Sequence, residues 1–164
     1  MYELKLLSKD AIPAALEKAE RYRFLNEPAE AESICLDVLR VDPENQRALV
    51  LLILALTDRF GRDYAVGVTP AQDLVMKLTG EYERAYFAGI VAERRGKTAL
   101  QRGTPGVVAG QFLREAMALY EKAAAKRPPG NDDAILRWNT CARIITQNRI
   151  PEDEPEERSG VELE

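Results

Sequence analysis

Residues that could carry catalysis or hold a metal are scarce in this 164-residue sequence. It contains no histidine, which removes the commonest general base, the histidine-paired serine and cysteine nucleophiles, and the imidazole ligands of metals. Its two cysteines, Cys35 and Cys141, lie far apart and form no CxxC pair. We therefore expect no catalytic residue, no metal and no cofactor, and a reducing, cytoplasmic location.

Two glycine-containing stretches resemble phosphate-binding loops only superficially. The triplet GKT at 96–98 would need a glycine where Val91 stands, and it falls inside a predicted helix. The stretch GTPGVVAG at 103–110 follows a predicted helix rather than a strand. Neither stretch predicts a nucleotide site.

Neighbouring carboxylates have simpler explanations than a metal site. Asp132 and Asp133 place negative charge at the start of a predicted helix, where the helix dipole favours it, and residues 152–154 belong to a charged tail. An enzyme or ligand-binding regulator built from Asp, Glu, Lys and Tyr is our third hypothesis. A cluster of buried ionisable residues in a pocket would support it.

The charge of the chain is unevenly distributed. The net charge is -4, but residues 151–164 carry seven acidic residues and one arginine, a net of -6, which leaves +2 for residues 1–150. We predict a helical domain over 1–150 and an acidic, disordered tail over 151–164, because the tail has too little apolar content to offset the entropy of ordering. Scattered charges at +2 lack the concentrated basic patch of a nucleic-acid-binding protein.

Association with a membrane is not expected either. The longest apolar run, ALVLLILAL at 48–56, is half of the roughly 20 residues that a membrane span needs. The N-terminal sequence MYELKLLSKD lacks the pattern of a signal peptide.

Apolar residues recur every three or four positions, which predicts an all-α protein. Proline, glycine and asparagine divide the pattern into seven predicted helices: 10–25, 27–41, 43–60, a short one from Thr69 to before Thr79, 81–102, 108–127, and one from 131 or 132 to 148. Four starts carry capping signals. We expect Asn26, Asp42, Thr69 with Gln72, and Asn131 or Asp132 to cap the helices that follow them.

The second helices of successive pairs share one spacing. Their small and apolar residues are Ala31, Cys35, Val38 and Pro43; Ala71, Val75 and Leu78; and Ala116, Tyr120, Ala123 and Pro128. The first helices align as well, because adding 34 to Ala15, Ala19 and Tyr22 gives Leu49, Ile53 and Leu56. Small residues at matched positions let paired helices approach closely, so the spacing is a packing pattern and predicts that Cys35 is buried.

This pattern resembles the tetratricopeptide-repeat (TPR) family, whose helix-turn-helix unit has 34 residues. The resemblance rests on Tyr22, Ala31, Pro43, Ala71, Ala116, Tyr120 and Pro128 and covers residues 10–148. It implies a right-handed α-solenoid of about three helical hairpins, closed by the seventh helix as a cap. Trp138 and Ile144 are expected to provide the apolar face of that cap.

A TPR-like stack offers a concave face lined by the first helix of each pair. The residues predicted to bind a partner there are Leu16, Glu20, Arg23, Arg47, Val50, Leu54, Tyr82, Tyr86 and Arg94. A structural interpretation competes for some of them, because Val50 and Leu54 fit a central, covered helix and the tyrosines fit a core. The positions that hold a C-terminal carboxylate in some TPR domains are Leu16, Glu20, Leu51 and Leu54 here, which disfavours that ligand.

The sequence therefore predicts a non-catalytic TPR-type adaptor or scaffold that binds a peptide or helix of a partner protein on its concave face. The main alternative is a structural subunit that assembles with itself, for example as a homodimer through its third or fifth helix.

Overall fold

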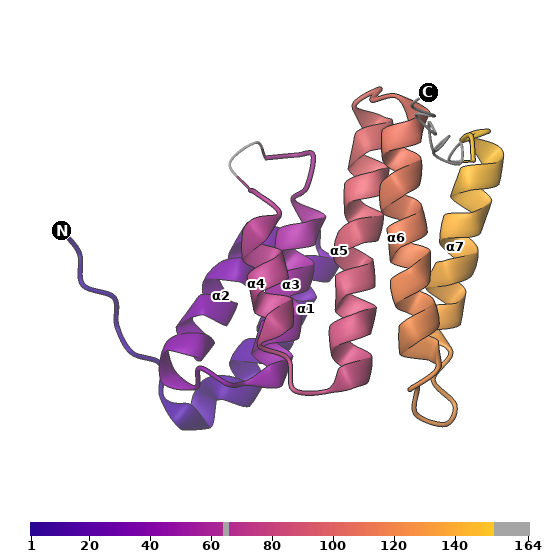
Figure 1. The fold of residues 1–164 in the computed structure, drawn as a ribbon. Helices are drawn as coiled ribbons and strands as arrows, with labels where there is room; N and C mark the ends of the chain where they lie inside the picture. Colours follow the sequence, from indigo (N-terminus) through magenta and orange to yellow (C-terminus); the bar gives the residue numbers. More distant parts are fainter. Residues whose placement is uncertain (64–65, 153–164) are drawn as a thin grey trace, which may run out of the picture.

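The structure is a computed structural model that describes residues 1–63 and 66–152 (Figure 1). Within these residues it contains a short 3-10 helix, seven α-helices and no strand, which confirms the all-α prediction. The elements are η1 (Lys9–Ala11), α1 (Ile12–Phe24), α2 (Pro28–Val41), α3 (Gln46–Asp58), α4 (Thr69–Met76), α5 (Glu81–Gln101), α6 (Gly106–Ala124) and α7 (Asp133–Gln147). The predicted tail mostly lies outside the described residues, which end at residue 152.

The start of α3 differs from the prediction. Asp42 does not cap it; the Asp42 backbone N–H instead donates to the Val38 carbonyl and ends α2. The N-cap is Asn45, whose Oδ1 accepts from the Ala48 N–H at 2.9 Å while its Nδ2 donates to Asp42 at 3.1 Å. Helix α3 therefore begins at Gln46 and not at Pro43.

Two further capping predictions are wrong and one is confirmed. Thr69 lies inside α4, and the Val68 carbonyl accepts from the Gln72 N–H, so no capping box forms. Asn26 ends α1 with a φ of 61°, but its side chain accepts from Arg62 and caps no helix. Before α7, both predicted candidates take part: Asp132 is the N-cap residue but makes no side-chain capping hydrogen bond, and the Asn131 side chain accepts from the N–H of Asp133, the first residue of α7, at 3.0 Å.

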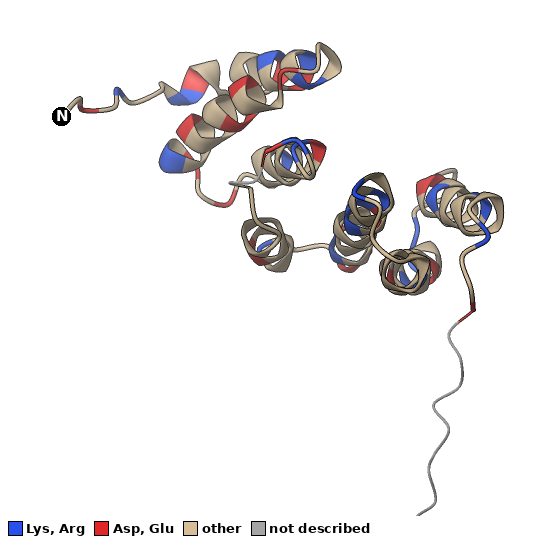
Figure 2. Ribbon diagram, turned by 90° about the horizontal axis from the view of Figure 1, so that it is seen from above, with Lys and Arg blue, Asp and Glu red and all other residues tan. Residues whose placement is uncertain are grey.

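The helices pack in the order of the chain (Figure 1). Each packs against the next, and in addition α1 contacts α3 and α3 contacts α5. Seen from above, α3, α5 and α7 lie along one side of the row, and α4 and α6 along the other (Figure 2). Helix α5 is central to both halves, because Val91 belongs to the N-terminal core while Ile90 belongs to the C-terminal one.

The tightest helix pair is α5 with α6, and glycine makes it possible. A Cβ at Gly89 would lie 2.5 Å from the Tyr120 ring, and one at Gly96 would lie 2.8 Å from Leu113. Neither distance is compatible with a side chain larger than hydrogen, so both glycines allow the two backbones to approach. The resulting contact buries Tyr120 and Leu113 completely.

The positions that share the repeat spacing are buried, apart from the exposed prolines Pro43 and Pro128. Exposure is 5% or less at Ala31, Cys35, Val38, Ala71, Val75, Leu78, Ala116, Tyr120 and Ala123. The predicted burial of Cys35 is therefore confirmed. Trp138 and Ile144 of α7 pack against the C-terminal core, as expected of the last helix.

No helix in residues 1–63 and 66–152 combines the length and the apolar character needed to cross a membrane.

Candidate functional site

Three charged residues form a ladder across α1, α3 and α5. Arg23 Nε donates to Asp58 Oδ2 at 2.8 Å, and Arg94 Nη2 lies 3.3 Å from Asp58 Oδ1. The side chains of Arg23, Asp58 and Arg94 are 16%, 18% and 32% exposed. Two of the arginines predicted to bind a partner are therefore held by one carboxylate, and we call this set the ion-pair ladder.

Asp58 was not among the predicted residues, although the sequence contained a signal for it. It follows Arg23 by 35 residues and precedes Arg94 by 36, close to the 34-residue spacing noted in the sequence. Opposite charges at this spacing on α1, α3 and α5 are placed to meet.

A second charged pair on α1 and α3 is more open. Arg47 and Glu20, both predicted, lie 3.5 Å apart, and their side chains are 47% and 45% exposed. An exposed pair of this kind contributes only ~0–1 kcal/mol. It restricts these side chains little, so they remain accessible to another molecule.

The predicted apolar residues are mostly used inside the protein. Leu16 is 3% exposed and lies in the N-terminal core. Val50 is half-buried against the same core, and Leu54 is half-buried against the C-terminal one. The prediction of a central, covered third helix fits these positions better than that of an open apolar groove.

The two predicted tyrosines stack on one another. The rings of Tyr82 and Tyr86 lie 5.6 Å apart, and Tyr86 also packs edge-on against Phe87 at 5.0 Å. The Tyr82 hydroxyl lies 3.4 Å from Asn131 Oδ1, and burial raises the pKa of both tyrosines. These rings therefore connect α5 to the C-terminal core.

Sequence reasoning missed a buried carboxylate on α5. Glu93 is fully buried and accepts from the Tyr120 hydroxyl at 2.6 Å, from Arg137 at 3.2 Å and from Lys97. Burial by itself raises the pKa of Glu93, but the hydrogen bonds from Lys97 and Tyr120 and the charges of Lys97 and Arg137 outweigh it and lower the pKa. We call these four residues the Glu93 network.

The Glu93 network has the features of a structural contact. Burial and the neighbouring carboxylate raise the pKa of Tyr120, which keeps its hydroxyl protonated as a donor. Glu93 accepts three donors and remains ionised, so it offers little to a substrate as a base. The network joins α5, α6 and α7.

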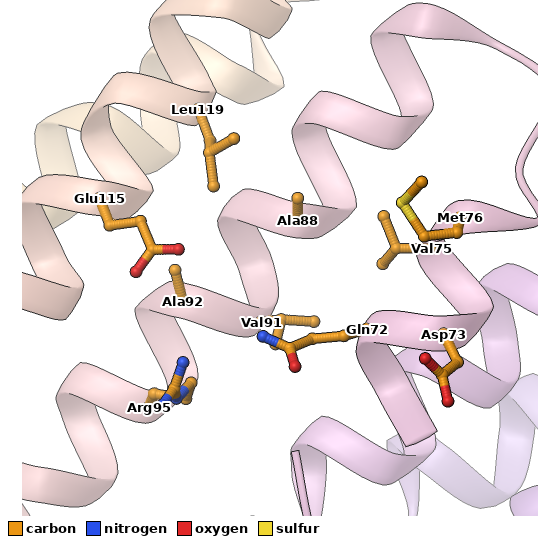
Figure 3. A pocket seen from close by; sticks show the side chains of 10 residues that line it. All are labelled: Gln72, Asp73, Val75, Met76, Ala88, Val91, Ala92, Arg95, Glu115 and Leu119. Carbon is orange, nitrogen blue, oxygen red and sulfur yellow. The ribbon is translucent and has the colours of Figure 1, made fainter. Parts of the chain in front are cut away.

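A pocket opens on the other side of α5, between α4 and α6 (Figure 3). Its volume is about 240 Å³. Ala88, Val91 and Ala92 of α5 form its floor, Val75 and Met76 of α4 one wall, and Leu119 of α6 the other; Gln72, Asp73, Arg95 and Glu115 complete the lining. We call this the α4–α6 pocket.

A second pocket, of about 250 Å³, continues along the same helix. It shares Arg95 with the α4–α6 pocket and extends to Arg102, with Phe60, Val68 and Phe112 around it. Arg95 lies 4.1 Å above the Phe112 ring, a cation–π contact. Together the two pockets form a groove that follows one face of α5.

The groove exists because α4 is short. Helix α4 has 8 residues, whereas α5 has 21 and α6 has 19, so α4 covers only part of the α5 surface that faces it. The sequence predicted the short helix but not the pocket, which also depends on the rotation of α5.

The remaining candidates for chemistry are inert. In the part of the chain that the structure describes, no group of three or more histidine, cysteine or acidic residues could hold a metal ion. Both cysteines are buried, and burial raises the pKa of Cys35 to about 11 and that of Cys141 to about 12. Neither thiol has the lowered pKa of a reactive cysteine.

Comparisons of the chain with protein-family models, with curated proteins and with solved structures find no match.

Proposed function

We propose that this chain is a non-catalytic helical-repeat scaffold of the TPR type that binds a segment of a partner protein. The observation that carries the proposal is the burial of nine repeat positions, which lie on α2, on α4, at Leu78 just beyond the end of α4, and on α6. Matched small and apolar residues buried in three successive helix pairs are what a stack of hairpins requires.

The contacts between alternate helices favour a curved stack. Helices α1, α3 and α5 touch one another in sequence, whereas a pocket separates α4 from α6. A right-handed solenoid of three hairpins with α7 as its cap would have this asymmetry, with the first helices on the concave side. The proposed location is cytoplasmic, since both cysteines are free and buried.

The chemistry of the site favours binding over catalysis. The buried ionisable residues Glu93 and Tyr120 bond to one another, and neither Glu93 nor Lys97 lines the α4–α6 pocket. That pocket instead offers apolar side chains from three helices, with a polar rim, which is typical of a protein-binding surface.

On the predicted concave face, the exposed pair Glu20 and Arg47 is the part best placed to contact a partner. The ion-pair ladder and the stacked tyrosines would give this face its rigidity. All nine predicted residues stay candidates for binding, with Leu16 the least accessible.

The test is proximity labelling with the full chain in its native cell, followed by binding measurements with each purified candidate. The proposal expects at least one protein that binds the purified chain directly and saturably. If every labelled protein fails to bind in purified form, the scaffold proposal is wrong.

Self-assembly is the second candidate function, and two exposed apolar residues favour it. Leu36 on α2 is 49% exposed and Met76 on α4 is 76% exposed, both at the rims of pockets. Size-exclusion chromatography with light scattering distinguishes the two functions. A dimer that persists at every concentration supports self-assembly, and a monomer excludes it.

A further inference from the structure

The α4–α6 pocket has the construction of a helix-docking site. Inside the protein, helices cross where small residues stand, as at Ala31, Ala116 and Gly89. The pocket floor repeats this arrangement with Ala88 and Ala92, one turn apart on α5, and with aliphatic side chains on both sides (Figure 3). No helix of the described chain occupies this place.

The α4–α6 pocket is long enough for about two turns of a helix. Its floor residues run from Ala88 to Arg95 on α5, which is roughly 10 Å along a helix axis, and Arg95 separates it from the second pocket. The small residues Ala88 and Ala92 on this floor allow the backbone of a docking helix to approach, and Val75 and Leu119 provide apolar contacts on its flanks.

The charges at the rim of the α4–α6 pocket select the kind of helix. Asp73 on α4 and Glu115 on α6 are exposed, and neither has a hydrogen-bond or ion-pair partner within the described chain. The positive charge at the rim, Arg95, remains charged where it stacks on Phe112, and it lies at one end of the pocket floor. The two walls beside the apolar floor carry negative charge, one residue on each.

From this geometry we propose that the α4–α6 pocket binds a basic amphipathic helix of a partner protein. Its aliphatic side chains pack on Ala88, Val91 and Leu119, and its Lys or Arg side chains, on both flanks, pair with Asp73 and Glu115. This inference rests on the proposed function and names the chemistry of the partner and the surface that receives it.

The probe is a synthetic helical peptide of about 14 residues, which spans roughly 21 Å. It carries an alanine and leucine seam with lysines on both flanks, and a second peptide has glutamate in place of every lysine. Binding to the full-length chain is measured by fluorescence anisotropy at low salt. The lysine peptide is expected to bind about tenfold more tightly or better, a difference of ~1.4 kcal/mol. Equal affinity for the two peptides, or no binding of either, contradicts the proposal.

Two pairs of substitutions distinguish binding of the peptide at the pocket from non-specific attraction to an acidic protein. Asp73→Asn with Glu115→Gln removes both rim charges, and Glu17→Gln with Glu44→Gln removes two exposed acidic charges elsewhere. The first pair is expected to weaken binding of the lysine peptide about tenfold at low salt, and the control pair to leave it within about twofold. If both pairs of substitutions weaken peptide binding equally, the peptide is attracted non-specifically to the acidic protein, and the proposal is overturned.

The position of the peptide is read from methyl NMR signals. The signals of Ala88, Val91, Ala92 and Leu119 are expected to shift on titration, and those of Leu16 and Val50 to stay. Shifts confined to the concave face overturn the assignment of the pocket. A natural partner that binds the wild type and the Asp73→Asn/Glu115→Gln variant equally also overturns it, while leaving the scaffold function intact.

Discussion

The two sides of α5 use their side chains in opposite ways. On one side, Asp58 of α3 is bonded to arginines of α1 and α5, and Glu93 of α5 is bonded to residues of α6 and α7. On the side facing α4 and α6, the carboxylates of Asp73 and Glu115 have no partner within the described chain, and apolar side chains line an open pocket. Both sides carry charge, but only the first uses it to hold helices together.

The difference follows from helix spacing. Where α1, α3 and α5 touch, polar side chains are partly buried and must be paired, because an unpaired buried charge is costly. Where a short helix leaves a gap, rim charges stay in water and need no partner. The paired side therefore accounts for stability, and the open side is available for binding.

The largest effect is expected from removing the centre of the Glu93 network. Glu93→Ala leaves Arg137, Lys97 and the Tyr120 hydroxyl without their acceptor, and we expect the free energy of unfolding to fall by about 3–5 kcal/mol. Urea denaturation measures this fall in the free energy of unfolding. The matched change Glu115→Ala at the pocket is expected to stay within about 0.5 kcal/mol. Comparable losses at the two sites would remove the contrast between the faces.

The close approach of α5 and α6 is tested at glycine. Gly89→Ala places a Cβ against the Tyr120 ring, and we expect a loss of about 1–3 kcal/mol although alanine favours helix formation by ~1 kcal/mol. Gly106→Ala is the control, because its Cβ meets only Pro151 at an ordinary 3.6 Å. Thermal or urea unfolding of both variants measures the change in the free energy of unfolding. A more stable Gly89→Ala protein would mean that the helices lie farther apart.

Much of the fold was predictable because local signals and packing agreed. Pro28, Gly61 and Gly130 mark boundaries that the structure respects, and the spacing of Ala31 and Cys35 indicated burial. The capping errors have a local cause. Asp42 and Asn45 can both accept a backbone N–H, and the choice between them depends on where α2 ends.

The surfaces were less predictable than the helices. Arg23 and Arg94 were both among the predicted binding residues, but Asp58 between them was not, since the relative rotation of α1, α3 and α5 is not encoded in any one segment. Glu93 sits in the apolar run GIVAE, and its partners Tyr120 and Arg137 come from two other helices. The α4–α6 pocket arises from the unequal lengths of its helices, which no single motif specifies.

The ion-pair ladder is expected to contribute less than the Glu93 network because its side chains are partly exposed. Asp58→Asn leaves two arginines without their carboxylate, and we expect a loss of about 1–2 kcal/mol. Asp73→Asn, on the open side, is expected to change stability by less than about 0.5 kcal/mol. Urea midpoints of the two variants give the comparison directly, and an Asp58→Asn protein as stable as the wild type would show that the ladder does not hold the helices together.

The smallest effect concerns pH and tests whether Glu93 is ionised inside the protein. Its pKa is lowered from the usual 4.5 in the folded state, so its contribution to stability is complete above about pH 4.5 and is lost as the pH falls through the lowered value. The Glu93→Gln variant has no such group to protonate. The stability gap between wild type and Glu93→Gln should therefore narrow from about pH 6 to about pH 3, as urea denaturation at each pH would show. A gap that widens toward acid would mean that Glu93 is protonated in the native protein, and the paired side of α5 would then rest on neutral hydrogen bonds instead of charge.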